Sequence, residues 1–236
     1  MQEIDEPMVI PLWINGHAYL TITQTFLDVC NPITGENLRR IPLCGADEAA
    51  KTVASAHDAL AGWAALTVGA RAALLLAVGE ALESYAKHFA GLIVEETGRQ
   101  TDQAAREVRD AIILLRVAAS APGDTSGLLA GVLALVCDDS APLLGPLSLA
   151  VPALLAGTTL VLKPSSKAPS VVFALAELTA RSGFPAGVFN VLQGDEAAIA
   201  GLCAARAVSA VQFSGDPALG IRVGAIAARY GKPFSA

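Results

Sequence analysis

Few side chains in this sequence have the type and spacing that nucleophilic catalysis or metal binding requires. The four cysteines lie far apart and form no CxxC pair, so the sequence predicts neither a zinc site nor a disulfide framework. We expect each cysteine to be a small structural hydrophobe, and we expect the three histidines, which lack ligand spacing, at the surface. These residues are Cys30, Cys44, Cys137 and Cys203, with His17, His57 and His88.

Two polar positions follow apolar runs, one of them a better candidate for ligand binding and the other a helix cap. Lys163 ends the apolar run 158–162, and parallel sheets bind ligands beyond the carboxyl ends of their strands. A solvated lysine at a strand end is the alternative interpretation. Asp216 follows the run 208–213, and with Pro217 it is suited to cap and open a helix.

The elements that must hold these residues alternate regularly from about residue 127 onward. Apolar runs at 131–137, 158–162, 188–192 and 208–213 are separated by amphipathic, helix-like segments, and 232–236 could start a fifth strand. Apolar strands joined through helices indicate right-handed βαβ units. The sequence therefore predicts an α/β fold with a Rossmann-like parallel sheet and helices on both faces.

Residues 1–120 have a different pattern, which predicts an N-terminal β-hairpin and a helical segment. Short β-like pieces are expected at 12–15 and 19–25, and Asn31-Pro32-Ile33-Thr34-Gly35 marks a turn between two extended pieces. Helices are then expected after Asp47, after Thr67, up to a C-cap at Gly98, and from about Asp102. We interpret 1–236 as a single domain, with parts at 1–120 and 127–236.

Composition excludes several classes of partner. The net charge of −6 gives no support for binding to nucleic acid or to an anionic membrane. The uncharged stretch 141–162 is long enough to span a bilayer, but three prolines and Gly157 divide it, so a buried helix followed by a buried strand is favoured. The N-terminus lacks the apolar region of a signal peptide, and we expect a cytoplasmic protein.

Several segments, in order and at the expected spacings, resemble the aldehyde dehydrogenase superfamily over essentially the whole chain. The most specific is PALLAGTTLVLKPS at 152–165, followed by GFPAGVFNV at 183–191 and Phe213-Ser214-Gly215. Earlier matches are Ile14-Asn15-Gly16, the turn at 31–36, Trp63, Arg71, Glu95-Glu96-Thr97-Gly98 and Glu107-Val108. The resemblance implies that family's cofactor-binding domain, which holds a nicotinamide cofactor without the GxGxxG fingerprint.

The resemblance places four residues at cofactor-contact positions. Lys163 matches the lysine that reaches the adenosine ribose, and Ser166 stands where the family has a ribose-binding glutamate. Gly215 and Asp216 lie in the turn that offers a serine and a helix N-terminus to the pyrophosphate. The Asp216 carboxylate would repel a phosphate there. The replacement of the glutamate by Ser166, with Lys167 beside it, would instead permit a cofactor with a 2′-phosphate. We expect binding of NAD or NADP to be weak at best.

The catalytic residues that the resemblance implies are not matched. The family's PWNFP segment reads Asp138-Asp139-Ser140-Ala141-Pro142. Ser140 stands at the asparagine that donates to the oxyanion, and Asp139 replaces the tryptophan that lies against the cofactor. The family's general base would follow just beyond the strand at 232–236, and its nucleophilic cysteine would lie far beyond it in a second, catalytic domain, so we expect this chain to lack both. We therefore expect no catalysis by the chain alone.

Relatives carry a long bridging hairpin where this chain has only 121–127. A hairpin without its docking surface would be an exposed sheet edge, so we interpret both reductions as natural rather than as an experimental truncation. A missing catalytic domain would also expose an apolar face, so we expect a homo-oligomer or a hetero-partner there.

Two functions stay open, and a third interpretation is that the chain is a decayed fragment with no role. The first is a non-catalytic binding or assembly module. The second is the NAD(P)-binding half of an aldehyde oxidoreductase that a separate catalytic chain completes.

Overall fold

The computed structural model of the chain describes residues 7–23, 25–120 and 131–236. The strands are β1 (Met8–Val9), β2 (Leu12–Ile14), β3 (His17–Tyr19), β4 (Phe26–Cys30), β5 (Asn37–Pro42), β6 (Val132–Cys137), β7 (Thr159–Lys163), β8 (Phe189–Val191), β9 (Val208–Ser214) and β10 (Phe234–Ser235). The helices are α1 (Ala46–Ala65), α2 (Val68–Ser84), α3 (Ala86–Thr97), α4 (Thr101–Ser120), α5 (Leu144–Leu155), α6 (Ser170–Arg181), α7 (Glu196–Ala204) and α8 (Pro217–Arg229). The loop expected at 121–127 lies outside the described residues.

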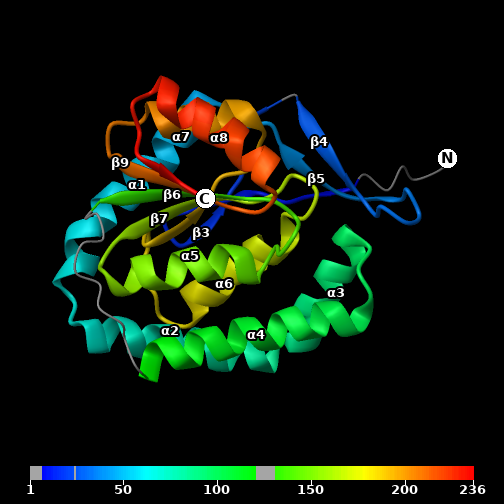
Figure 1. Cartoon of the computed structure of the whole chain (residues 1–236), viewed down its shortest axis with the longest axis horizontal. Helices are drawn as coiled ribbons and strands as arrows, with labels where there is room; N and C mark the ends of the chain where they lie inside the picture. The colour runs from blue at the N-terminus through cyan, green and yellow to red at the C-terminus, as the bar shows by residue number, and fades with distance from the viewer. Residues whose placement is uncertain (1–6, 24, 121–130) are drawn as a thin grey trace.

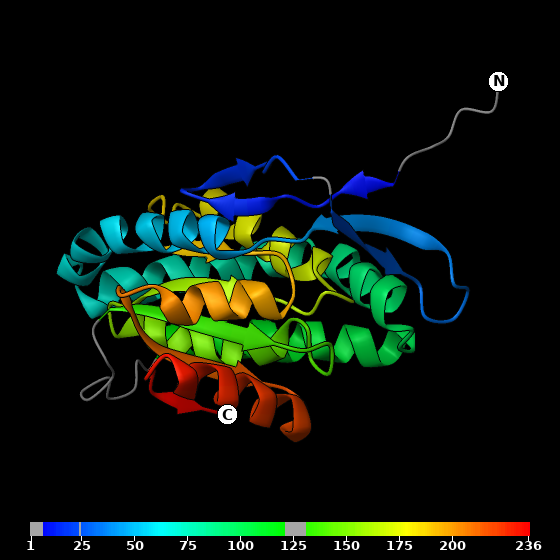
Figure 2. The ribbon, with the colours of Figure 1, turned by 90° about the horizontal axis from the view of Figure 1, so that it is seen from above.

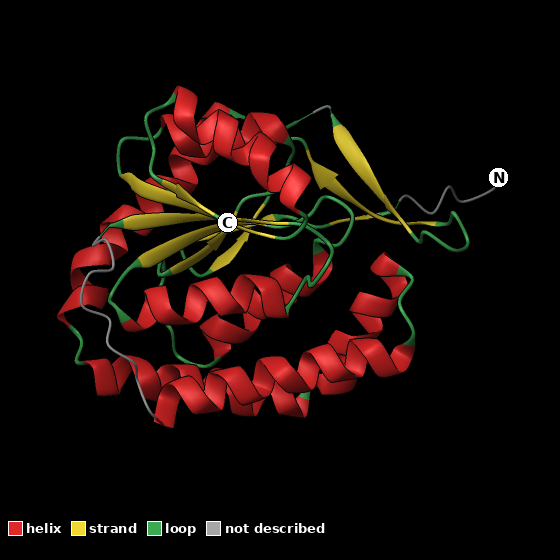
Figure 3. Cartoon of the chain, in the orientation of Figure 1, coloured by secondary structure: helices red, strands yellow, loops and turns green. Residues whose placement is uncertain are grey.

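A large sheet with the strand order β10-β9-β6-β7-β8-β2-β3 forms the centre of the molecule, and β1-β5-β4 form a small sheet at the N-terminal end (Figures 1 and 3). Strands β6 to β10 pair in parallel. The predicted α/β fold with a Rossmann-like parallel sheet is confirmed, and so is the expected fifth strand, which pairs with β9.

The N-terminal hairpin requires a correction. Strand β2 pairs antiparallel with β8, so the large sheet is mixed, and the hairpin extends it. Asn15 and Gly16 both have positive φ, as a tight two-residue hairpin turn requires, and this turn closes β3 after β2. The strand expected at 19–25 is therefore wrong, because β3 already ends at Tyr19 and β4 begins at Phe26.

Alternate residues of the strands separate the core into two layers, because successive side chains of a strand point to opposite faces. Leu133 and Leu135 of β6 pack with α5, α6 and the outer helices α2 to α4. Val132 and Val136 pack with α1, α7 and α8 on the other face. Figure 1 shows these two helical layers with the sheet between them, and Figure 2, seen from above, shows α1, α7 and α8 in front of the sheet. Both faces of the parallel strands are thus buried, as their continuous apolar sequences require.

Helix α5 ends against two buried side chains of the N-terminal part. The indole of Trp63 donates to the carbonyl of Leu154, at 3.0 Å, and the guanidinium of Arg71 donates to that of Leu155, at 2.9 Å. The last carbonyls of a helix lack partners within the helix, so these donors satisfy them. This contact explains why two polar groups are buried between α1, α2 and α5.

Within the described residues, no single helix is long and apolar enough to cross a membrane. By length and composition only, α1 and α2 taken together are a candidate membrane span, but they meet at a bend of 118°.

A buried carboxylate links the outer helices to the sheet. Glu96, near the end of α3, is 2% exposed and accepts hydrogen bonds from the backbone and hydroxyl of Ser170, the first residue of α6. Arg39 of β5 contacts the same carboxylate at 3.4 Å. Burial raises the pKa of Glu96 to about 7, although the bonds from Ser170 and the charge of Arg39 lower it.

This raised pKa predicts a pH-dependent stability. Between the ordinary glutamate pKa and about pH 7, the folded chain holds a proton that the unfolded chain has lost. The free energy of unfolding should therefore fall by about 3 kcal/mol as pH rises through this window, and should not change further above it through this group. Urea unfolding at pH 5 and pH 7.5 measures the difference.

The variant Glu96→Gln should lose most of this difference, because it cannot titrate but still accepts from Ser170. Glu95→Gln is the matched control, since it removes a carboxylate from the same arginine at the surface. An unchanged pH difference in Glu96→Gln would contradict the assignment.

Candidate functional site

The strand order places one crevice at the carboxyl edge of the sheet. Strand β6 has β7 on one side and β9 on the other, and the chain reaches them through helices on opposite faces, α5 and α7. Because these helices lie on opposite faces, the loops on the two sides of β6 diverge and leave a gap between them. Open α/β sheets bind ligands in such a gap. The strands end in this region with Cys137, Lys163 and Ser214.

A cavity of about 370 Å³ lies in this crevice, between the strand ends and helices α7 and α8. Ile199, Leu219 and Val223 contribute apolar wall, and Lys163 and Ser166 are among its polar residues. Two of the four predicted cofactor positions thus line one cavity. Its charged lining residues include four acids against three bases: Asp138, Asp139, Asp195 and Glu196 against Lys163, Lys167 and Arg222.

Lys163 is buried, with 6% exposure, so the interpretation as a solvated lysine at a strand end is wrong. Its ammonium donates to the carbonyl of Pro164 at 2.7 Å. Among the described residues no carboxylate forms an ion pair with it. Burial lowers the pKa of Lys163 to about 8, while Cys137 and Asp195 raise it. The side chain is therefore a poorly solvated cation at the inner end of the cavity.

The turn between β9 and α8 is closed by carboxylates of the chain itself. Asp216 is the N-cap of α8, and its Oδ1 accepts from the backbone of Ala218 at 2.8 Å and Leu219 at 3.3 Å. Pro217 has no N–H to offer. The N–H of Asp216 donates to Oδ2 of Asp138 at 2.6 Å. From Asp216 to Leu219, every backbone N–H is thus bound by a carboxylate of this chain.

Gly215 is required by the same contact. A Cβ at this position would lie 2.2 Å from Cγ of Asp138, and Gly215 has a φ of +149°. The Asp138 carboxylate therefore lies directly against the turn. The sequence-based interpretation did not identify Asp138, although two successive acids after the fully apolar strand β6 mark the place.

Asp138 also holds Ser140. Its Oδ1 accepts from the backbone of Ser140 at 2.7 Å and from its hydroxyl at 2.5 Å. The one hydroxyl proton of Ser140 is thus directed at Asp138, and the side chain is not oriented to donate to a ligand. Asp139 lies beside it and accepts from the hydroxyl of Ser165 at 3.0 Å.

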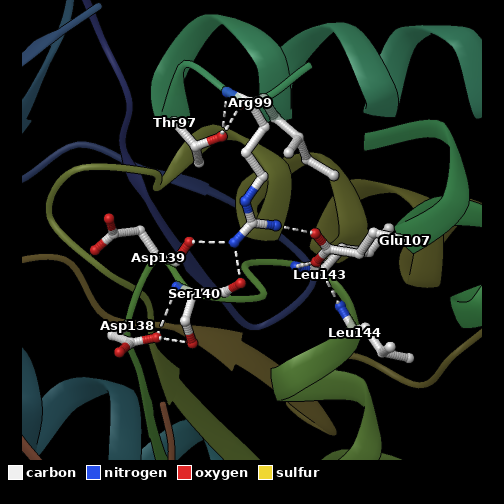
Figure 4. Close-up of polar contacts among 9 residues, drawn as sticks. Thr97, Arg99, Glu107, Asp138, Asp139, Ser140, Leu143 and Leu144 are labelled. Carbon is white, nitrogen blue, oxygen red and sulfur yellow. Dashed lines mark hydrogen bonds and ion pairs between the residues drawn. The ribbon is translucent and has the colours of Figure 1, made fainter. Parts of the chain in front are cut away.

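Arg99, between α3 and α4, and Glu107 of α4 hold this loop from the outer layer (Figure 4). Arg99 donates to Glu107 at 2.6 Å and to the carbonyls of Asp139 and Ser140. The other oxygen of Glu107 accepts from the backbone of Leu143 at 2.9 Å and Leu144 at 3.1 Å. Since Leu143 gives no side-chain cap to α5, Glu107 supplies the acceptor from another helix. Glu107, from the Glu107-Val108 segment identified in the sequence, thus fixes the start of α5.

The cysteines and histidines do not add to the site as nucleophiles or ligands. Burial raises the pKa of Cys137, which lines the cavity, to about 12, so the group stays a thiol. Cys44 and Cys203 are buried as expected, but Cys30 is exposed, because the outer face of β4 is open, and this expectation was wrong. The three histidines are at the surface. No group of three or more potential metal ligands occurs within the described ranges.

The bonds of Asp138 predict a large effect of its removal. Asp138→Ala leaves the N–H groups of Asp216 and Ser140 without their acceptor and should lower the free energy of unfolding by about 2–3 kcal/mol. Asp139→Ala is the matched control, because among the described residues only the Ser165 hydroxyl donates to that side chain, and it should cost less than about 1 kcal/mol. Equal losses in urea unfolding would show that Asp138 does not hold the turn.

Comparison with known proteins agrees with this geometry. The model of the aldehyde dehydrogenase family matches residues 19–236. Malonate-semialdehyde dehydrogenases of Geobacillus kaustophilus and Pseudomonas aeruginosa are 30% and 31% identical over 89% of this chain, which covers 46% and 45% of those enzymes. The chain thus spans about half the length of the curated relatives it matches.

Solved structures give the same result. Lactaldehyde dehydrogenase of Escherichia coli superposes with a TM-score of 0.89 at 28% identity, covering 97% of this chain and 51% of that one. A mutant of Aldehyde Dehydrogenase C from Pseudomonas syringae, in complex with NAD+ and octanal, has a TM-score of 0.87 at 26% identity, covering 95% and 49%. From its sequence motifs, its fold and these matches, the chain belongs to the aldehyde dehydrogenase family.

Proposed function

We propose that this chain is a non-catalytic member of its family, a binding or assembly module whose nicotinamide-cofactor site is closed. The observation that supports this most is the β9–α8 turn. Helix N-termini attract phosphate through free N–H groups and a partial positive charge. Here Asp138 and Asp216 occupy the N–H groups and bring negative charge to the same place.

The expected size of this effect is large. Two unit charges about 4 Å apart interact by about 4 kcal/mol at an effective dielectric of 20. Such a cost weakens binding by about a thousandfold, from micromolar to millimolar. A pyrophosphate would also have to displace the carboxylates from their backbone donors. Ser140, whose hydroxyl is bound by Asp138, further supports loss of oxyanion stabilisation.

The second candidate is an NAD(P)-binding half that a separate catalytic chain completes. Two observations favour it: the cavity with Lys163 is present, and a solved relative is in complex with NAD+. Under this alternative, the curated relatives would suggest a semialdehyde as the substrate of the completed enzyme.

Titration with NAD and NADP tests the proposal. By calorimetry, the natural chain should bind either cofactor more weakly than about 1 mM. Asp216→Ser should lower the dissociation constant at least about tenfold, because it removes the charge and serine is also a good N-cap. Asp195→Ser is the matched control: it makes the same exchange at the N-cap of α7, which lines the same cavity.

Micromolar binding by the natural chain would overturn the proposal and favour the second candidate. An equal gain in both variants would show that general charge, and not the β9–α8 turn, limits binding.

We also propose that the chain is cytoplasmic and that a second copy or another protein covers its cofactor-side edge. All four cysteines are free, which suits a reducing compartment. Beside the cavity, α8 exposes Leu219 and Ile221, the latter by 74%, and exposed apolar groups of this kind favour a partner.

Self-association should be visible in sedimentation velocity, as a sedimentation coefficient that rises with concentration. Ile221→Asp should reduce this rise, because a charge at a buried contact opposes association. The matched exchange Ile113→Asp, on the distant helix α4, should not. A natural chain that stays monomeric at all concentrations and binds no partner would contradict this proposal.

A further inference from the structure

The cavity holds a nucleophile that the proposed function does not use. Lys163 lines a cavity whose apolar wall comes from Ile199, Phe213 and Val223. The residue is more than nine-tenths buried, and its amine donates a hydrogen bond to a neutral carbonyl, that of Pro164. An amine in an apolar, poorly solvated site can attack carbonyl compounds, as Schiff-base lysines do.

We propose that Lys163 captures small aliphatic aldehydes as a reversible imine. The amine nitrogen attacks the carbonyl carbon and gives a carbinolamine, which loses one water to form the C=N bond. No oxidant or reductant is needed, and water reverses the step. The proposal deepens the binding role suggested above by naming its ligand class. It rests on that role in one respect only, which is that no cofactor occupies the cavity.

The surroundings of Lys163 favour the neutral amine. Burial lowers the pKa of Lys163 to about 8. At pH 7.5, about a quarter of such an amine is neutral, against about one in a thousand for a lysine with an ordinary pKa. The carboxylates nearby hold backbone and side-chain donors instead of this ammonium: Asp138, Asp139 and Asp195 accept from Asp216, Ser165 and Ala197.

The neighbouring thiol does not compete for the carbonyl. Burial raises the pKa of Cys137 to about 12, so its nucleophilic thiolate is rare at neutral pH. The cavity also selects among carbonyl compounds. Its apolar wall suits an alkyl tail, while the acidic excess among its charged residues disfavours an aldehyde that carries a carboxylate.

Reductive trapping tests the proposal on the full chain. The protein is incubated with hexanal and cyanoborohydride at pH 7.5, and the alkylated lysines are identified by mass spectrometry over time. Lys163 should react at least about tenfold faster than the exposed lysines Lys51, Lys87 and Lys167, because more of it is neutral. Glyoxylate, an anionic aldehyde, should not show this preference.

Two variants and one denatured control complete the test. Lys163→Arg should abolish the fast phase and leave the slow reaction of the other lysines. Val223→Phe should slow the reaction of Lys163 by filling the cavity, with Lys167 unchanged. In urea the preference should disappear. Reaction of Lys163 no faster than that of Lys167 in the folded protein would overturn the proposal.

The two proposals fail separately. If 1 mM NAD protects Lys163 from trapping, the closed-site proposal is wrong, while capture stands. If Lys163 is not preferred, capture is wrong, and the calorimetric titration with NAD and NADP decides the closed site by itself.

Discussion

The N-termini of helices need acceptors for their free N–H groups, and this requirement organises the carboxyl edge of the sheet. Each of the four helices that follow a parallel strand receives a carboxylate from the chain. Glu107 serves α5, Glu96 serves α6, Asp195 serves α7 and Asp216 serves α8. Two of these carboxylates come from the outer helices α4 and α3, so the capping bonds also attach the outer layer to the core. Removing Glu107 or Glu96 would leave a buried donor unpaired and loosen the packing of the layers.

The same arrangement decides the electrostatics of the cavity. Helix N-termini directed at one edge would ordinarily create a positive region that attracts anions. Here Glu107, Asp195 and Asp216 bring negative charge to this edge and accept from backbone donors, whereas burial raises the pKa of Glu96 to about 7. In the described part of the chain no carboxylate forms an ion pair with Lys163 at the end of β7, although acids line the same cavity. The weak solvation of this lysine and the closure of the β9–α8 turn are thus two results of one pattern.

The sequence predicts the strands and helices of 131–236 well, because apolar periodicity and capping residues are local signals. Thr67, Asp195 and Asp216 cap the helices that were expected to begin there. The antiparallel addition of β2 to β8 could not be predicted, since Trp13 and Val191 are joined only by the tertiary fold. At the site, Lys163 and Asp216 were identifiable from their strand and helix ends. Asp138 and Glu107 were not, because their partners Asp216 and Leu143 lie 78 and 36 residues away.

Asp216 shows how cofactor affinity can be exchanged for stability of the ligand-free chain. A cap that leaves N–H groups free is complete only when a phosphate binds, so the ligand stabilises the fold. Asp216 completes the cap without a ligand, and Asp138 completes the turn that precedes it. Under the function proposed above, the chain would gain little from a nucleotide, because an anion would have to compete with carboxylates already at hydrogen-bond distance. A chain whose site is closed in this way would keep its fold and its cavity without needing the cofactor. An uncharged ligand bound through Lys163 would not be repelled by the carboxylates of the β9–α8 turn.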